Sequence, residues 1–380
     1  MKNILFIASD NAKTSGAFLC MVKLCELLKK NYNCNVIVVL PGIGDGKPLL
    51  DEIGVKTYMV KSCTWAVPNE WSKIDSLKFE AKMMVYNYPA IRKIRSIIRS
   101  EKIHIVHINT SWTYVGAVAA LKEKVKLVWH IRECMQISQN RHIPMRQLGY
   151  SLLNQSDRII VISDFVYDTY HHLQSDKLVK IYEGIEIYNY YQKREILKNN
   201  TVNILILGLL CEQKGQNQVI EAARILYEQK IDNINISIVG RGLPEERRKL
   251  TCLVDKYNLN EIVKFYDATS NPDEYYKNAD IFIMASTAEA FGRTTVEAML
   301  EGCLVIGADS GATTELLDAG FCGLLYKPGD VKKLAEKIIY AINNREQMRQ
   351  LAKKGQEFAY NNFTAEKNAQ LIHKLYEDLG

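Results

Sequence analysis

The sequence lacks most of the patterns that mark disulfide-rich, zinc-binding and membrane-spanning proteins. Its nine cysteines stand singly and no two form a C-x-x-C pair, so neither a disulfide framework nor a zinc site is indicated. No stretch approaches the roughly 18 consecutive apolar residues that a membrane-spanning helix needs. The apolar part of residues 1–10 is too short for a signal peptide and is typical of a buried strand. We therefore expect a cytoplasmic protein with reduced, mostly buried thiols.

Two further motifs are missing, and each absence argues against a class of site. There is no Asp-x-Asp motif, and the His, Cys and Asp residues show no metal-ligand spacing, so no metal site is expected. Residues 10–17 do not supply the G-x-G-x-x-G turn that follows the first strand of nicotinamide-dependent oxidoreductases.

Length and composition are those of a globular protein with two domains. The chain has 380 residues, of which 47% are hydrophobic and 24% charged. A net charge of +6 is too small to indicate a dedicated nucleic-acid partner. It suits an anionic small ligand, an anionic membrane surface, or simply a solvated basic surface. The proline-poor composition, rich in Asn and Lys, is typical of a bacterial protein.

Short apolar runs alternate with helical patterns along the whole chain. Strands are predicted at residues 4–8, 36–40, 103–108, 126–130, 158–162, 204–207, 236–239, 263–266, 281–284 and 304–306. Helices are predicted at residues 17–30, 91–99, 217–229, 245–257, 295–301 and 365–379. This alternation predicts an α/β fold built from βαβ units with parallel sheets.

Residues 187–200 interrupt the alternation with a Tyr-rich, polar stretch. We expect a first Rossmann-like domain at 1–187, a linker at 188–200, a second Rossmann-like domain at 201–362, and a final helix at 363–380. Ligands of such sheets bind beyond the carboxyl ends of the strands. Two such domains facing each other would leave a cleft between those ends.

The segment 285–302 places two glutamates eight residues apart at a predicted strand-to-helix junction. Glu289 follows the strand, and Glu297 is expected in the first turn of the helix. Backbone N–H groups at such a helix start favour anions. The junction therefore suits a ligand with hydroxyls at both ends and phosphate between them, such as a nucleotide sugar. For Glu297 alone, a carboxylate that merely stabilises the helix is the alternative.

Three other positions are weaker candidates. Lys214 follows the first strand of the second half and can reach phosphate, although a Lys-Gly pair is usually a surface turn. Gly16 opens the first long helix and permits close approach of a ligand, or marks a plain helix start. His130 ends a first-half strand, next to the weaker candidates Arg132 and Glu133. A lone histidine is more often structural, and we interpret His104 and His107 in that way.

Taken together, these segments resemble the retaining glycosyltransferases of the GT-B class, family 4 type. Residues 289–297 are similar to the family's E-x7-E motif, including its Phe-Gly and its Glu-Ala-Met continuation. Weaker similarities to family segments lie at residues 15–17, 181–185, 208–215 and 311–315, with Gly320 and Gly323. The matches follow the family's order over nearly the whole chain.

The resemblance implies a role for each candidate. Glu289 would bind hydroxyls of the transferred sugar, and His130 would lie near that sugar on the first-domain side. Glu297 would hold the ribose, and the loop around Ala268 would meet the base. The diphosphate would be neutralised by Lys214 and by backbone amides around Gly16, Phe291, Gly292, Arg293 and Thr294. The final helix would cross back onto the first domain.

The family's reaction is usually drawn as front-face attack, in which a leaving phosphate oxygen accepts the acceptor's proton. Neither a metal nor a dedicated protein base is then required, and no cofactor is expected beside the nucleotide sugar. The donor implied is a UDP-sugar, with a GDP-sugar less favoured. The acceptor implied is a hydroxyl of a glycan or lipid-linked molecule, as in the synthesis of bacterial surface polysaccharide.

The sequence departs from the family pattern at several positions. Leu209 replaces the arginine beside Gly208, which removes one cation for the diphosphate, and Arg293 is one residue able to compensate. Arg241 stands where an acidic residue is usual, and Asp267 where a glycine is expected. Glu183 replaces a frequent Asn. The departures keep open a non-catalytic partner subunit, and an epimerase of nucleotide sugars on the same fold is a further alternative.

The predicted helix at residues 91–99 is basic and amphipathic. Such a helix suits the anionic inner face of a cell membrane, where it would bring the site near a lipid-linked acceptor. The alternative is a helix packed on the first sheet with a solvated basic face.

Overall fold

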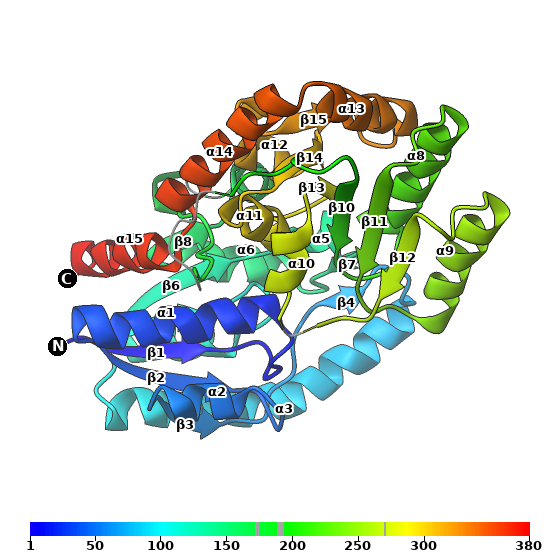
Figure 1. The fold of residues 1–380 in the computed structure, drawn as a ribbon. Coiled ribbons are helices and arrows are strands. Elements are labelled where there is room, and N and C mark those ends of the chain that lie inside the picture. Colours follow the sequence, from blue (N-terminus) through cyan, green and yellow to red (C-terminus); the bar gives the residue numbers. More distant parts are fainter. Residues whose placement is uncertain (172, 174, 188–193, 270) are drawn as a thin grey trace. The chain divides into compact units, whose positions relative to one another are not determined.

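The computed structural model describes residues 1–171, 173, 175–187, 194–269 and 271–380 (Figure 1). The chain forms two compact units. Unit 1 comprises Met1–Glu186 and Thr364–Gly380, and unit 2 comprises Ile187–Phe363. Each unit is an α/β layer structure with one parallel main sheet, which confirms the predicted fold class.

Unit 1 is built on a seven-stranded sheet in the order β3-β2-β1-β5-β6-β8-β9. Its strands are β1 (Asn3–Ile7), β2 (Asn35–Leu40), β3 (Lys56–Met59), β5 (Ile105–Ile108), β6 (Lys126–Ile131), β8 (Arg158–Val161) and β9 (Leu178–Lys180). A separate antiparallel pair joins β4 (Val67–Pro68) to β7 (Arg141–His142). The helices are α1 (Gly16–Tyr32), α2 (Lys47–Glu52), α3 (Lys73–Ser100), α4 (Val115–Glu123), α5 (Met135–Ser138), α6 (Arg146–Asn154), α7 (Asp164–Tyr170), η1 (Ser175–Lys177) and α15 (Ala365–Asp378).

The C-terminal helix α15 belongs to unit 1, although the chain reaches it from unit 2 (Figure 1). Ala369, Ile372 and Tyr376 are buried in the same core as the inner face of α1. Gly184 allows the close approach, because a Cβ there would lie 2.7 Å from the Cα of Ala365. The crossing of the final helix, expected from the resemblance, is thus part of the observed fold.

Unit 2 has a six-stranded sheet in the order β12-β11-β10-β13-β14-β15. Its strands are β10 (Val202–Leu207), β11 (Ile234–Val239), β12 (Val263–Tyr266), β13 (Ile281–Met284), β14 (Leu304–Ala308) and β15 (Leu324–Tyr326). Its helices are η2 (Glu212–Lys214), α8 (Gln216–Glu228), α9 (Pro244–Lys256), α10 (Asp273–Asn278), α11 (Arg293–Leu300), α12 (Thr313–Leu316), η3 (Asp318–Gly320), α13 (Val331–Asn343) and α14 (Arg345–Asn362). All pairings in both main sheets are parallel.

Both strand orders reverse direction at one point, between β1 and β5 in unit 1 and between β10 and β13 in unit 2. The loops beyond the carboxyl ends of such neighbouring strands diverge, and ligands of doubly wound sheets bind in the resulting crevice. The loop from Gly208 to Gly215 follows β10, and the loop from Ala285 to Gly292 follows β13. Topology therefore brings Lys214 and Glu289 to the switch point of unit 2.

Residues 188–193 of the expected linker lie outside the described residues. The segment 194–200 is attached to unit 2, since Ile196 and Leu197 are buried in its core. Arg194 donates hydrogen bonds to the carbonyl oxygens of Tyr276 and Ala279 at 2.6 and 2.5 Å. Arg349 donates from Nε to the carbonyl of Ile196 at 3.0 Å. The structure therefore places the second half of the expected linker on the body of unit 2.

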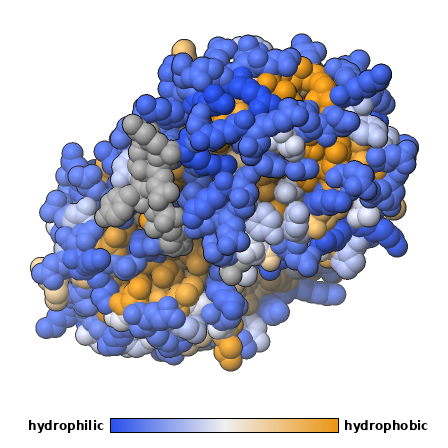
Figure 2. All heavy atoms as spheres, viewed as in Figure 1, coloured by the Kyte–Doolittle hydropathy of each residue, from blue (hydrophilic) through white to orange (hydrophobic). Residues whose placement is uncertain are grey.

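Figure 2 shows a mainly hydrophilic face on which hydrophobic residues gather in separate patches. Among the described residues, no helix combines the length and apolar character that crossing a bilayer requires.

Candidate functional site

The ion pair between Lys214 and Glu289 lies at the switch point of unit 2. Lys214 ends η2, and Gly215, in a left-handed conformation with φ +72°, is the N-cap residue that precedes α8. A Cβ at Gly215 would lie 2.4 Å from the carbonyl oxygen of Ala285, so only glycine permits this approach to the end of β13. The backbone N–H of Thr287 donates to the carbonyl of Gln213 at 3.2 Å and ties the two loops together.

The backbone of Glu289 is held by the loop that precedes α12. Its carbonyl oxygen accepts a hydrogen bond from the N–H of Ala312 at 2.9 Å. Gly311, at φ +55°, lies so close that a Cβ would come within 2.6 Å of the Glu289 carbonyl oxygen. Ser310 donates from Oγ to the carbonyl of Ser286 at 3.0 Å. The segment 310–312 therefore fixes the position from which the Glu289 carboxylate projects.

The helix α11 begins at Arg293, after Gly292 in a left-handed conformation with φ +97°. Backbone N–H groups of a first helical turn carry partial positive charge and favour anions. The predicted anion-binding residues Phe291, Gly292, Arg293 and Thr294 thus stand at a helix start, next along the chain from Glu289. Phe291 itself is buried, with its ring 5.8 Å from that of Phe363.

Glu297 lies in the second turn of α11, so the expectation that it falls in the first turn was wrong. The helix starts two residues earlier than the periodicity indicated, because Gly292 ends the preceding loop. The Tyr276 hydroxyl donates to Glu297 Oε2 at 2.8 Å, and Arg293 Nη2 lies 3.5 Å from Oε1. A carboxylate this far along the helix gains little from the helix dipole. Its side chain is instead oriented by Tyr276, which is fully buried in α10.

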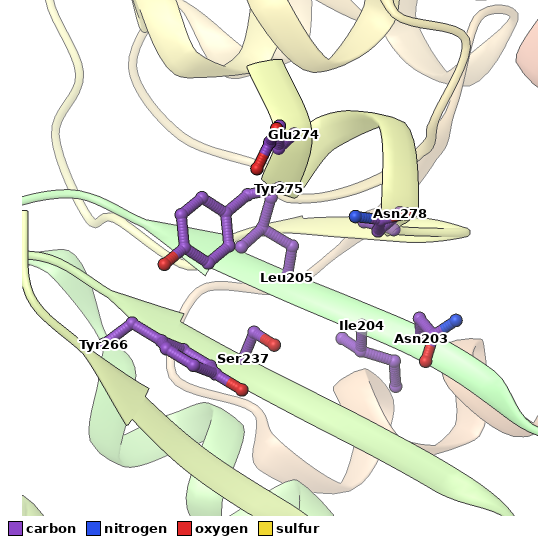
Figure 3. A pocket seen from close by; sticks show the side chains of 9 residues that line it. Asn203, Ile204, Leu205, Ser237, Tyr266, Glu274, Tyr275 and Asn278 are labelled. Carbon is purple, nitrogen blue, oxygen red and sulfur yellow. The ribbon is translucent and has the colours of Figure 1, made fainter. Parts of the chain in front are cut away.

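Ala268 lies in an exposed loop after β12. Its neighbour Asp267 pairs with Arg247 of α9, with Nη1 and Oδ1 2.5 Å apart. A pocket of about 500 Å³ lies beside this loop and is drawn in Figure 3. It is lined by Asn203, Ile204, Leu205, Ser237, Tyr266, Glu274, Tyr275, Asn278 and Ala279. None of the predicted donor residues lines it, so the pocket and the Lys214–Glu289 site are distinct features of unit 2.

Gly16 is the first residue of α1, after the first strand at the switch point of unit 1. The N-cap residue Ser15 accepts from the N–H of Phe18 at 3.4 Å and donates to Asp10 Oδ2 at 3.1 Å. Burial raises the pKa of Asp10. Gly16 therefore opens a well-capped helix, and its predicted contact with a ligand stays a prediction.

His130 is fully buried in β6 and belongs to a polar chain that runs through unit 1. Its Nδ1 lies 3.2 Å from both His107 Nε2 and Arg132 Nη2, and the Tyr376 hydroxyl lies 2.6 Å from His107 Nδ1. Because arginine only donates, His130 Nδ1 must accept, which leaves the proton on Nε2. His107 then donates from Nε2 and accepts the tyrosine hydroxyl at Nδ1. Burial and the Arg132 charge hold the pKa values of both histidines well below their usual range.

The Nε2–H of His130 has no hydrogen-bond partner within the described part of the chain. A buried donor without a partner costs free energy, of the order of 1–3 kcal/mol. In the structure the side chain has no exposed surface, so its contact with a sugar stays a prediction.

Sequence reasoning missed the ion pair between Arg132 and Glu183, both of which are buried. Arg132 also donates from Nε to the carbonyl oxygen of Asn109 at 3.0 Å. Next to it, Glu133 accepts from the backbone N–H of Ser111 at 2.6 Å, and burial raises its pKa to about 7. The sequence did contain a signal for this pair. Arg132 and Glu183 are charged residues of opposite sign within apolar stretches, and a buried charge needs a partner of opposite sign.

Two family models match the chain. Residues 23–188 match the model described as glycosyltransferase family 4, and residues 191–358 match the model described as glycosyl transferases group 1. Together they cover unit 1 from α1 to the expected linker and most of unit 2.

Known proteins of similar sequence and structure agree with these models. An uncharacterised glycosyltransferase of Methanocaldococcus jannaschii is 26% identical over 78% of this chain and 85% of its own length. The alpha-monoglucosyldiacylglycerol synthase of Acholeplasma laidlawii is 23% identical over 96% of this chain and 94% of its own length. The crystal structure of HepE from Anabaena in complex with UDP has 22% identity and a TM-score of 0.82, with all of both chains covered.

Three features of the structure agree with these matches: the E-x7-E segment at a strand-to-helix junction, the two Rossmann-like units, and the C-terminal helix that returns to unit 1. The protein belongs to the family 4 type of GT-B glycosyltransferases.

Proposed function

We propose that the protein transfers a sugar, with retention of configuration, from a nucleotide-diphosphate sugar to a hydroxyl of a glycan or lipid-linked acceptor. The observation that carries the proposal is the Lys214–Glu289 ion pair at the switch point of unit 2, next along the chain from the start of α11. A cation, an anion and a helix N-terminus at one sheet edge match phosphate and sugar hydroxyls.

The chemistry follows from where charge develops. The bond between the anomeric carbon and the diphosphate oxygen breaks, and a bond to the acceptor oxygen forms on the same face. The acceptor's proton passes to a phosphate oxygen of the leaving group. Lys214 and the first-turn amides of α11 would stabilise the growing negative charge on the diphosphate.

Lys214 would keep Glu289 as a partner and gain phosphate oxygens when the donor binds. An ammonium group has three N–H donors, and one of them bonds to Glu289 Oε1. The other two can reach phosphate while this bond persists. Glu289 keeps its second oxygen for sugar hydroxyls, which would orient the sugar for transfer. We further propose that this reaction is independent of metal, because Lys214 supplies positive charge at the diphosphate.

UDP-sugars are the proposed donors, ahead of GDP-sugars. The support is the UDP bound to HepE of Anabaena, a protein of similar fold. The name of the Acholeplasma relative supports a lipid-type acceptor. Synthesis of bacterial surface glycans, in the cytoplasm or at the inner face of the membrane, is the proposed setting.

A thermal-shift screen tests the donor first. UDP-, GDP- and ADP-sugars are each added at equal concentration, because a ligand that binds only the native state raises Tm. We expect the largest rise with a UDP-sugar and a smaller rise for the Glu297→Ala variant. The absence of any rise with all three classes contradicts the proposal.

Turnover is measured next, as release of free nucleoside diphosphate in the presence of chelator and candidate acceptors. Release in EDTA supports the metal-independent transfer, and the anomeric configuration of the product, read by NMR, tests retention. Donor binding without any release would favour a non-catalytic subunit, and conversion of the donor without acceptor would favour an epimerase.

A further inference from the structure

The first half of α3 in unit 1 exposes a row of large apolar side chains. Ile74, Leu77, Met84, Val85 and Tyr88 are each 60–69% exposed. An exposed apolar residue is ordinary when it stands alone, but contiguous ones mark an interaction surface.

These side chains lie on one side of the helix. Ile74, Leu77, the exposed Ala81, either Met84 or Val85, and Tyr88 follow one another at intervals of three or four residues. Such spacing places residues above one another on one face. We call the row from Ile74 to Tyr88 the α3 stripe.

Buried contacts on the opposite side fix the rotation of the helix. Asn87 is fully buried and brackets the backbone of Cys63, accepting from its N–H at 2.8 Å and donating to its carbonyl at 3.1 Å. Met83 and Ala90 are buried on the same side. The outward direction of the α3 stripe is therefore built into the packing of unit 1.

The α3 stripe lies in a positively charged segment. Residues 73–93 contain five Lys and Arg against two Asp and Glu. Lys78 and Lys82 are exposed beside the α3 stripe, and the exposed Arg92 follows it with its guanidinium 5.8 Å from the Tyr88 ring.

The second half of α3 is engaged within unit 1. Arg95 and Arg99 both pair with Glu123 of α4, at 2.6 and 2.7 Å. Ile94 and Ile97 are buried. The apolar side of residues 91–99 is therefore packed within unit 1, whereas Arg92 and Lys93 are exposed, and a membrane contact of this segment stays a prediction.

Aromatic residues stand at both ends of the α3 stripe. Trp71 precedes α3 and is 40% exposed, with its ring edge-on to Phe79 at 5.4 Å. Tyr88 closes the row. Tryptophan and tyrosine are favoured at the boundary between lipid headgroups and acyl chains. An apolar row with lysines beside it and aromatic ends has the composition of a helix that lies in a membrane interface.

We propose that the α3 stripe is the surface by which this protein binds an anionic lipid bilayer. Burial of the apolar row in the interface and attraction of Lys78, Lys82 and Arg92 to anionic headgroups act together. A second copy of the chain is a poorer occupant, because it would bring the same positive segment against itself. The inference extends the proposed function by naming the surface that would meet a lipid-linked acceptor, but it does not depend on catalysis.

Flotation of the full-length protein with lipid vesicles tests the proposal. Vesicles are made of phosphatidylcholine alone or with phosphatidylglycerol added. We expect at least tenfold more protein to float with the anionic vesicles, and less at high salt, since salt screens the lysines. The Leu77→Glu/Val85→Glu variant should lose most of this binding, and Lys78→Glu/Lys82→Glu should lose the preference for anionic lipid.

Two controls separate the possible outcomes. Phe321→Glu changes an equally exposed apolar residue in unit 2 and should float like the wild type. Lys214→Ala should also float normally, so failure of the catalytic proposal leaves this test intact. Unchanged flotation of Leu77→Glu/Val85→Glu overturns the proposal. The proposal is also overturned if the wild type does not float and instead forms a dimer in light scattering that Leu77→Glu/Val85→Glu abolishes. A second copy of the chain would then occupy the α3 stripe.

Discussion

Lys214 and Glu289 stand 75 residues apart in sequence and form an ion pair beyond the neighbouring strands β10 and β13. The pair joins the two residues predicted to face the diphosphate and the sugar. Backbone hydrogen bonds also hold the pair in place. The N–H of Thr287 donates to the carbonyl of Gln213, and the N–H of Ala312 donates to the carbonyl of Glu289, so the loop after β13 is bound to the loops that follow β10 and β14. The site is therefore preorganised, which is the condition for electrostatic stabilisation of a transition state.

Replacing Lys214 with alanine should reduce the turnover number by about 100-fold or more, since removal of one preorganised donor to a developing anion costs about 3 kcal/mol. Tm should change little, because the Lys214 side chain is one-third exposed. Lys333→Ala is the matched control, since it removes another Lys–Glu pair of unit 2, with Glu336 in α13. Equal turnover by the two variants would remove Lys214 from the mechanism.

Gly311→Ala should slow transfer by displacing Glu289. The new Cβ would meet the backbone nitrogen and oxygen of Glu289 at 2.7 and 2.6 Å, and the residue has φ +55°. Gly329→Ala supplies the control, because Gly329 also has positive φ, +78°, but nothing within 4 Å of a Cβ. Both variants lose about 1–2 kcal/mol of stability from backbone strain. Only Gly311→Ala should lower kcat, by roughly tenfold, and equal kcat values would refute the contact argument.

Tyr276→Phe should weaken donor binding through Glu297. The variant removes the hydroxyl that donates to Glu297 Oε2 at 2.8 Å, while the ring remains buried. We expect a rise in donor KM of about threefold to tenfold, or about 1 kcal/mol, with kcat nearly unchanged. Glu297→Ala should raise donor KM further, whereas Glu301→Ala, one turn along α11, should not. A fall in kcat without a change in KM would argue against a ribose-binding role.

Glu133→Gln tests the titration of a buried carboxyl in unit 1. Burial raises its pKa from 4.5 to about 7, so between these pH values the folded state holds a proton that the unfolded state has released. Stability of the wild type is therefore lost as pH rises from 4.5 to 7, by up to about 3 kcal/mol. The glutamine of the variant cannot titrate in this window. His107 and His130 are present in both proteins, so their titration cancels in the difference between wild type and variant. The difference in unfolding free energy, measured by urea denaturation, should shift across this window and level off above it. A constant difference would contradict the assignment.

Most strands of the two main sheets followed from apolar periodicity, and those at residues 263–266 and 281–284 match β12 and β13 to the residue. Short edge strands such as β3 and β15 were not predicted, because three or four half-buried residues carry too little periodic signal. Helix α3 was recognised only in its last third. In its first half, apolar residues lie on the exposed side of the helix as well as on the buried side, where Met83 is. The hydrophobic pattern therefore does not distinguish the buried face from the exposed one.

The candidate site shows the same division. The E-x7-E segment is local in sequence, and its strand, Phe-Gly turn and helix could be predicted from the residues themselves. The pairings that position it are not local. Lys214 with Glu289, Tyr276 with Glu297 and Arg132 with Glu183 depend on which strand ends become neighbours. Sequence patterns predict strands more readily than their order in the sheet.

The most direct test of the donor site is hydrogen–deuterium exchange of the backbone amides, with and without the nucleotide sugar that raises Tm most. The predicted result is protection in peptides covering residues 208–216 and 287–297, since the loop after β10 and the start of α11 would hold the diphosphate. Donor binding that instead protects only the lining of the pocket of Figure 3, at residues 203–205, 237, 266, 274, 275, 278 and 279, would contradict the assignment of Lys214, Glu289 and Glu297.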